Sequence, residues 1–182
     1  MKRHVSRAGE KLEFAIRHFG LDLDGKVVAD FGSSTGGFVD CLLQNGAARV
    51  YSVDTSYGEL DWKLRNNPKV VVMERTNAMH VSLPEKVDMM TIDVGWTRLA
   101  KVLPNALRNL KQDGQIIALI KPHYEADRKF IKKGRLMEER VEEVLEKVRG
   151  DVEGLEARVL GIVESPIEGK RAKNREFLGL IT

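Results

Sequence analysis

Four charged side chains of this chain each follow an apolar run directly: Asp30, Asp54, Asp93 and Lys121. Short apolar runs of this kind are typical of strands that are buried in a sheet. In open α/β sheets, ligands bind beyond the carboxyl ends of the strands. We therefore expect these side chains to share one site, where carboxylates can accept hydrogen bonds and a lysine can hold or move a proton.

The first of these acids opens a glycine-rich turn, which runs from Asp30 to Phe38 and reads DFGSSTGGF. Glycines let the backbone of such a turn approach a ligand closely. The spacing is G-x-x-x-G-G rather than G-x-G-x-x-G, which disfavours a nicotinamide-dependent oxidoreductase. Asp54, at the end of the next strand, could accept hydrogen bonds from both hydroxyls of a ribose. Two strand-end acids with a glycine turn between them resemble the cofactor site of S-adenosylmethionine (SAM) methyltransferases.

The other two charged residues, Asp93 and Lys121, end strands that are neighbours in the usual order of such a sheet. A carboxylate and an ammonium at these positions would lie close enough to interact. The pair could close the top of the sheet as a simple ion pair, or it could take part in catalysis. Pro122 follows Lys121 and ends the strand, since proline has no backbone N–H.

The histidines and the cysteine do not predict a metal site. The four histidines show no metal-ligand spacing, and the single cysteine, Cys41, lies in an apolar helical stretch where a packing role is expected. We expect His4 and His18 at the surface and His80 in a loop.

Three further residues with aromatic rings have a structural and a functional interpretation. His123 is close to Lys121, so it could touch a substrate or simply lie at the surface. Trp62 and Trp96 are more often packing residues than platforms for base stacking. Trp96 has the better claim to stacking because it follows Asp93 closely.

Strand-like and helix-like segments alternate along the chain, which predicts an α/β fold with a mostly parallel sheet and helices on both faces. The predicted strands are 26–31, 49–53, 69–73, 87–92, 114–120, 155–163 and 175–181. The predicted helices are 38–45, 58–65, 98–110 and 137–149. The last two strands are joined by the polar loop 165–174, so one of the seven strands is expected to be antiparallel. No linker or repeat is present, and we expect a single domain over residues 1–182.

An additional helix precedes the first strand, within residues 1–20. Ser6 is a good N-cap and Gly20 a good C-terminal stop. The buried stripe of this helix is expected to consist of Leu12, Ala15, Ile16 and Phe19. Lys11 lies at the edge of that stripe, so its ammonium could reach over the top of the sheet.

The composition is that of a folded protein with unevenly distributed charge. The 182 residues are 42% hydrophobic and 31% charged, which suits one domain with a substantial core. The formal net charge is +3, and positive charge concentrates in residues 1–20, 121–135 and 165–177. These segments are either solvated surface or a surface for a phosphate backbone. No apolar run approaches the roughly 18 residues that span a bilayer, and the start lacks the apolar part of a signal peptide, so we expect a cytoplasmic protein.

Several blocks of the sequence resemble a single family. The blocks are VSRAGEKLEFAI (5–16), DFGSSTGGFVDCLLQNGA (30–47), VYSVDTSYGELDWKLRNNPKVVVMERTNA (50–78), TIDV (91–94), IKPHYEA (120–126) and NREFL (174–178). Together they resemble the TlyA proteins, also called hemolysin-A-like, within the FtsJ-type ribosomal RNA methyltransferases. The resemblance implies a Rossmann-like SAM-dependent methyltransferase fold, SAM as cofactor, and methyl transfer to a ribose 2′-hydroxyl of ribosomal RNA or of a ribosomal particle.

The resemblance also implies roles for individual residues. FtsJ-type enzymes use a Lys-Asp-Lys-Glu tetrad, and the matching positions here are Lys11, Asp93, Lys121 and Glu176. The family's cofactor contacts map onto Asp30, Gly32, Ser33, Ser34, Thr35, Gly36, Gly37, Phe38, Asp54, Thr76, Asn77, Ala78 and Asp93. Asn77 would lie beside the adenine. Lys121 would act as the base; Lys11 would favour its neutral form, whereas the two acids would oppose that form while holding both lysines in place.

The basic segments favour RNA once the tetrad is placed on the sequence. The segments 1–20 and 165–177 contain Lys11 and Glu176, and the segment 121–135 begins at Lys121. Members of the family carry a small RNA-binding domain before the SRxGxKL block, and these 182 residues do not include it. We therefore expect weak binding to isolated RNA and better binding to a ribosomal particle.

Two departures from the family pattern keep an alternative open. Residues 93–98 read DVGWTR where the family commonly reads DVSFIS, and His123-Tyr124 replaces a usual Gln-Phe. The alternative is a SAM-binding but catalytically weak or inactive RNA-binding or ribosome-assembly factor. A membrane-active hemolysin is disfavoured, because the sequence has no long apolar segment and no basic amphipathic helix.

Overall fold

Seven strands form one sheet in a computed structural model that describes residues 4–169 and 172–182. The strand order is β3-β2-β1-β4-β5-β9-β8. These strands are β1 (Val27–Phe31), β2 (Arg49–Val53), β3 (Val70–Met73), β4 (Val87–Ile92), β5 (Leu110–Ile120), β8 (Val159–Glu164) and β9 (Phe177–Ile181). β1 to β5 are parallel, and β9 runs antiparallel to both of its neighbours. The predicted sheet, mostly parallel with one antiparallel strand, is confirmed.

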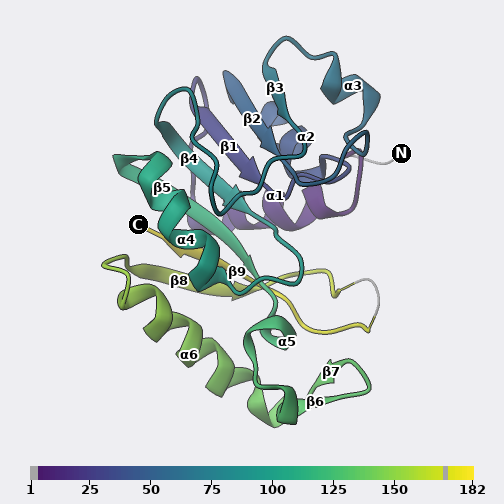
Figure 1. The fold of residues 1–182 in the computed structure, drawn as a ribbon, viewed down its shortest axis with the longest axis vertical. Coiled ribbons are helices and arrows are strands. Elements are labelled where there is room, and N and C mark those ends of the chain that lie inside the picture. Colours follow the sequence, from purple (N-terminus) through teal and green to yellow (C-terminus); the bar gives the residue numbers. More distant parts are fainter. Residues whose placement is uncertain (1–3, 170–171) are drawn as a thin grey trace.

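Helices cover both faces of the sheet (Figure 1). The α-helices are α1 (Ala8–Phe19), α2 (Gly37–Gln44), α3 (Trp62–Arg65), α4 (Leu99–Asn109), α5 (Pro122–Glu125) and α6 (Val141–Glu153). One apolar core lies between the sheet and α1 and α2, and the other lies between the sheet and α4 and α6. Successive residues of a strand serve different cores: Val28 faces the first, and Ala29 the second. A strand that is buried on both faces explains the continuous apolar runs of the sequence.

Helix α1 begins at a slightly different residue from the one predicted. Its N-cap is Arg7 rather than Ser6, without a side-chain capping bond, and the Ser6 carbonyl accepts from the Gly9 N–H at 3.2 Å. The C-terminal stop is confirmed, because Gly20 adopts φ +65° and caps the helix. Leu12, Ala15 and Ile16 are buried as predicted, whereas Phe19 is only partly buried.

Two other segments differ more from prediction. The helix predicted over 58–65 is reduced to α3, because the Gly58 N–H donates to Glu74 Oε1 at 2.8 Å and Asp61 then caps a short helix through the Lys63 N–H. The helix predicted over 137–149 is shifted, since a 3₁₀ turn (Glu138–Arg140) comes first and α6 continues to Glu153. The strand predicted over 155–163 consequently begins only at Val159.

Two small elements beyond β5 were not predicted. Pro122 begins the short helix α5, since proline is well tolerated in the first helical turn. A hairpin of β6 (Ile131–Lys132) and β7 (Arg135–Leu136) follows, after a 3₁₀ turn (Arg128–Phe130). The predicted basic segments also include Lys2, Arg3, Lys170 and Arg171, which lie outside the described residues.

Candidate active site

Asp93 and Lys121 form an ion pair beyond the ends of β4 and β5. The Lys121 ammonium donates to Asp93 Oδ1 at 2.5 Å and to the Val94 carbonyl at 3.2 Å. The expected contact between these two strand-end residues is thus confirmed. An ammonium has three donors, so one N–H of Lys121 remains for another partner.

A second ion pair joins the Lys11 ammonium to a carboxylate oxygen of Glu176. Lys11 comes from α1 and Glu176 is the residue before β9, so this ion pair joins the N-terminal helix to the last strand of the chain. The two side chains are only 8% and 6% exposed, whereas Lys121 and Asp93 are 15% and 21% exposed. Lys121 is therefore the lysine that a substrate can reach more readily.

The two ion pairs lie in a common electrostatic environment. Burial raises the pKa of the Asp93 carboxyl, and the Lys121 ammonium opposes that rise. Lys11 also lowers this pKa and Glu176 raises it, so the other three predicted tetrad residues all act on Asp93. The structure brings together the four residues that the family pattern selects, and their roles stay a prediction.

A cleft of about 1210 Å³ opens over these pairs. Its charged lining consists of two acids, Asp93 and Glu176, and six cations, namely Arg7, Lys11, Arg98, Lys101, Lys121 and Arg128. Both acids are already paired with lysines. The other four cations form no salt bridge within residues 4–169 and 172–182. The cleft therefore carries positive charge that no salt bridge neutralises, around the two ion pairs.

Aromatic rings form part of the cleft wall. Trp96 has its ring centroid 5.3 Å from that of Tyr124, and the His123 ring lies 4.1 Å from Tyr124. Trp96 is 78% exposed and adopts φ +61°, so of its two interpretations the packing role is wrong, and base stacking stays a prediction. Trp62 is 74% exposed, and its predicted packing role is wrong as well. Burial lowers the pKa of His123 to about 4, which leaves its ring neutral at pH 7.

The glycine turn follows β1 and lies against the end of β4. Gly32 has φ +92°, and a Cβ there would come within 2.5 Å of the Asp93 carbonyl oxygen, so only glycine allows this approach. Gly36 has φ +94°, and a Cβ there would meet Leu64 Cδ1 at 2.3 Å. The turn therefore needs glycine both for its backbone conformation and for its close neighbours.

Asp54 joins the glycine turn to the loop after β3. Its Oδ2 accepts from the Ser34 N–H at 2.7 Å, and its Oδ1 accepts from the Ser56 N–H and hydroxyl, both at 2.7 Å. Its carbonyl accepts from the Thr76 N–H at 2.9 Å. A carboxylate has about four lone-pair sites, so Asp54 can still accept from a ribose hydroxyl. The acceptor chemistry of this corner therefore fits the ribose of SAM.

The other residues predicted to hold the cofactor differ in how accessible they are. Asp30, Ser33, Phe38 and Ala78 are buried, whereas Ser34, Thr35 and Asn77 are exposed. Burial raises the pKa of Asp30 to about 7, and Thr91 donates to its Oδ1 at 2.6 Å. Asp93 is the one predicted cofactor residue among those that line the cleft described above.

Several site residues were not found from the sequence. Arg98 and Lys101 lie outside the three basic segments, yet both line the cleft from the start of α4. Asn105 donates to the carbonyls of Ala78 and Val81 at 2.8 and 2.9 Å, so α4 also holds the loop after β3. The sequence held one signal for this contact, namely the polar Asn105 on the apolar face of a helix. A buried polar side chain needs hydrogen-bond partners, which here come from the loop after β3.

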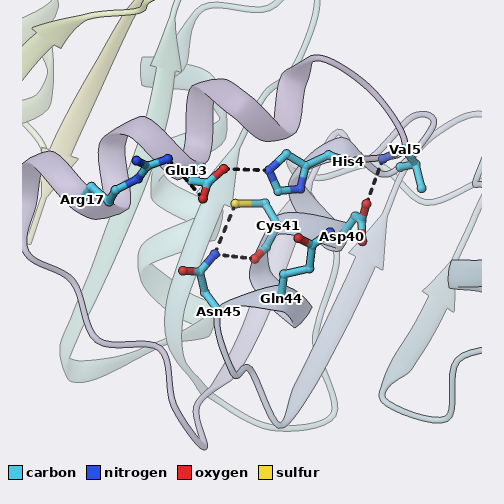
Figure 2. A network of polar contacts seen from close by, with 8 residues as sticks. All are labelled: His4, Val5, Glu13, Arg17, Asp40, Cys41, Gln44 and Asn45. Atoms are coloured by element: carbon cyan, nitrogen blue, oxygen red, sulfur yellow. Dashed lines mark hydrogen bonds and ion pairs between the residues drawn. The ribbon is translucent and has the colours of Figure 1, made fainter. Parts of the chain in front are cut away.

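The segment before α1 packs differently from the prediction for His4. Figure 2 shows His4 turned toward Glu13, and the His4 Nε2 lies 3.0 Å from Glu13 Oε2. The Val5 N–H donates to Asp40 Oδ2 at 2.8 Å, which ties the same segment to α2. His4 is 5% exposed, so its predicted surface position is wrong. The His4 ring packs against Gly9, and the absence of a side chain at Gly9 leaves room for it.

Comparison with known proteins decides the family. The family model described as FtsJ-like methyltransferase matches residues 4–181. The chain belongs to this family. The sheet described above is the Rossmann-like fold of SAM-dependent methyltransferases.

Relatives and solved structures agree with this assignment. YqxC of Bacillus subtilis is 42% identical over 183 residues, covering 97% of this chain and 64% of the relative. The 16S/23S rRNA (cytidine-2′-O)-methyltransferase TlyA of Mycobacterium tuberculosis is 37% identical over 185 residues, covering 98% of this chain and 68% of that protein. A structure from Streptococcus thermophilus, named as a hemolysin, has a TM-score of 0.95 and 38% identity, covering 100% of this chain and 67% of that chain.

The chain thus spans about two thirds of the length of these relatives. Despite the hemolysin name, no helix among the described residues has the length and apolar character needed to cross a membrane.

Proposed function

We propose that this protein transfers a methyl group from SAM to a ribose 2′-hydroxyl of RNA, and that this RNA is ribosomal. The observation that carries the proposal is the cleft in which the Lys121–Asp93 and Lys11–Glu176 pairs lie beneath cationic side chains. The family assignment and the activity in the name of the M. tuberculosis relative support it. A cytoplasmic location follows from the proposed substrate.

The chemical problem is a poor nucleophile, since a ribose hydroxyl keeps its proton at neutral pH. SAM supplies an electrophilic methyl group on a sulfonium. Lys121 Nζ would take the hydroxyl proton as the ribose oxygen bonds to that methyl carbon, whose bond to sulfur would break. Lys121 must first be neutral to accept this proton. The role of Asp93 is to orient the Lys121 side chain toward the ribose hydroxyl. Much of the acceleration would come from holding the reacting atoms in line.

The more deeply buried pair has a positioning role in this scheme. Lys11 and Glu176 are too shielded to be the first contact of a substrate, and they set the charge that surrounds Asp93. Glu176 also holds the Lys11 ammonium in place, so that the positive charge of Lys11 stays at one position.

The cofactor would occupy the corner between the glycine turn and Asp54. Asp54 would accept from a ribose hydroxyl, the Gly32–Gly37 backbone would lie along the amino-acid end of the cofactor, and Asn77 would lie beside the adenine. The turn meets the end of β4 at Gly32, so a methyl donor in this corner would lie beside Asp93.

The RNA would enter through the cleft. Arg7, Arg98, Lys101 and Arg128 form no salt bridge among the described residues, so they can bind phosphates. Trp96 and Tyr124 offer ring faces for an unstacked base, which is how many RNA-binding sites hold single-stranded nucleotides.

The decisive experiment measures transfer of labelled methyl from SAM to ribosomal subunits taken from cells that lack this gene. We expect label in one subunit, and mapping of 2′-O-methyl positions should show a ribose that is methylated only with the protein. SAM binding without methyl transfer to any subunit or RNA would favour the non-catalytic RNA-binding factor instead. The replaced loop at Gly95 and Trp96 is the observation that keeps this second function in view.

A further inference from the structure

The hairpin β6–β7 carries an unusual concentration of free positive charge. Lys132, Lys133 and Arg135 are all exposed, and none forms a salt bridge within the described ranges 4–169 and 172–182. Ile131 and Gly134 of the same hairpin line the cleft that contains Lys121 and Glu176. The hairpin therefore borders the candidate active site, and its three exposed cations lie outside the cleft lining.

The turn of this hairpin places a lysine where lysine is disfavoured. Lys133 has φ +50° and Gly134 has φ +78°, the backbone pattern of a two-residue type I′ turn. Asn or Gly suits the first of these positions much better, because a side chain there is strained. A strained residue that carries a charge at an exposed tip suggests that the charge is needed there.

Asn174 holds this short hairpin in place. Each of its strands has two residues, which is too little for independent stability. The Asn174 side chain accepts from the Leu136 N–H at 3.0 Å and donates to the Gly134 carbonyl at 2.9 Å, and the residue is only 7% exposed. A single buried amide therefore clamps the hairpin backbone at two points.

The clamp lies on the same segment as Glu176 of the buried Lys11–Glu176 ion pair. Asn174, Arg175 and Glu176 are consecutive, and each reaches a different element. Arg175 binds Glu138 and Glu164, and Glu176 binds Lys11. Asn174 and Glu176 are two residues apart, so the short backbone between them links the position of the hairpin to that of the Lys11–Glu176 ion pair.

We propose that the hairpin β6–β7 is an arm that binds the phosphate backbone of the substrate RNA, and that Asn174 is a positioning residue that sets this arm relative to the Lys11–Glu176 pair. The proposal rests on the proposed function for the identity of the polyanion. It goes beyond that function by assigning a specific contact surface and the residue that positions it.

The first test separates charge from fold at the turn. Lys133→Asn gives an Asn-Gly type I′ turn, so thermal stability should be unchanged or higher. Affinity for a labelled single-stranded RNA and for ribosomal subunits should nevertheless fall, and the slope of log affinity against log salt should become shallower by about 0.7. Reversing Lys132 and Lys133 to Glu should weaken binding further, with SAM affinity intact. Unchanged RNA affinity and salt slope in Lys133→Asn would overturn the arm.

The second test addresses the clamp. Asn174→Ala should weaken RNA affinity by roughly tenfold, since it removes two hydrogen bonds that hold the arm. Its effect should be less than additive with Lys132→Ala plus Lys133→Ala, because both changes act through the same contact. Asn45→Ala is a matched control: its Nδ2 donates to the Cys41 carbonyl at 2.8 Å on α2, so it should affect stability but not RNA affinity. Full additivity, or a loss of RNA affinity equal to that of the control, would contradict the positioning role.

Failure of this inference can be distinguished from failure of the proposed function. RNA affinity is measured without SAM and does not depend on methyl transfer. A protein that binds RNA through the arm but transfers no methyl contradicts only the proposed function. A protein that transfers methyl, while Lys133→Asn and Asn174→Ala bind RNA as the unmodified protein does, contradicts only the arm.

Discussion

The ammonium of Lys11 is paired with the carboxylate of Glu176, 165 residues further along the chain, and both side chains are buried. Glu176→Gln keeps the shape of the side chain but leaves a buried ammonium without its counter-charge. We expect this change to lower the free energy of unfolding by roughly 3–5 kcal/mol and to reduce the rate of methyl transfer. Urea unfolding and a labelled-SAM assay measure the two effects.

A double variant separates stability from catalysis at this pair. Lys11→Met with Glu176→Leu removes both buried charges, so much of the stability should return. Methyl transfer should not return, because the positioned charge beside Asp93 is lost. A double variant with normal transfer would show that the pair is only structural.

Lys121 is the proposed base, and arginine at this position tests that role. Lys121→Ala should abolish methyl transfer with SAM affinity nearly unchanged, and Lys121→Arg should also be inactive because a guanidinium stays protonated. Asp93→Ala should reduce the rate, and its effect should not add to that of Lys121→Ala. A fully active Lys121→Arg protein would remove Lys121 from the role of base.

Asp54 is expected to hold the cofactor ribose and to fix the glycine turn. Asp54→Ala removes the acceptor of the Ser34 and Ser56 N–H groups, so SAM affinity should fall by at least tenfold, as expected for charge-assisted hydrogen bonds of about 1.5–3 kcal/mol each. Glu59→Ala is the control, because it loses only a 3.2 Å contact with the Ser34 hydroxyl. Calorimetry measures both affinities. Equal affinity in Asp54→Ala rejects its role, and no SAM binding to the unmodified protein rejects the cofactor proposal.

The two exposed tryptophans provide a matched pair for the substrate site. Trp96 is 78% exposed in the cleft, and Trp62 is 74% exposed on α3 and does not belong to the cleft lining. Trp96→Ala should weaken RNA binding by about 1–3 kcal/mol, the usual contribution of base stacking, whereas Trp62→Ala should not. Comparable losses in both variants, measured by fluorescence anisotropy, would argue against stacking on Trp96.

Asp30 should make stability depend on pH. Burial raises its pKa from 3.8 to about 7, so the folded protein keeps a proton that the unfolded chain releases near pH 4. The free energy of unfolding should therefore fall as pH rises between these values, by an amount on the order of 4 kcal/mol for this group alone. Asp30→Asn cannot titrate and should lack this contribution. Urea unfolding of both proteins across this range measures it, and a constant difference between them at every pH would contradict the assignment.

Local sequence rules were sufficient for the elements that carry the site. Apolar runs ended by Asp30, Asp54, Asp93 and Lys121 predicted strands whose carboxyl ends share one edge, and parallel pairing then brought Asp93 and Lys121 into contact. The glycine turn was recognisable because glycine is needed wherever φ is positive and backbones approach closely. The Lys11 and Glu176 roles came from family resemblance, since no local pattern relates residues so far apart.

Only the tertiary structure decided which side chains are exposed and which are paired. Trp62 and Trp96 are exposed, and His4 is buried against Glu13, contrary to what their residue types favour. Arg98 and Lys101 became part of the cleft because α4 starts beside Asp93, and the hairpin over Ile131–Leu136 depends on Asn174 from the far end of the chain. Exposure and pairing depend on contacts between distant segments, and the sequence of one segment contains no record of what packs against it.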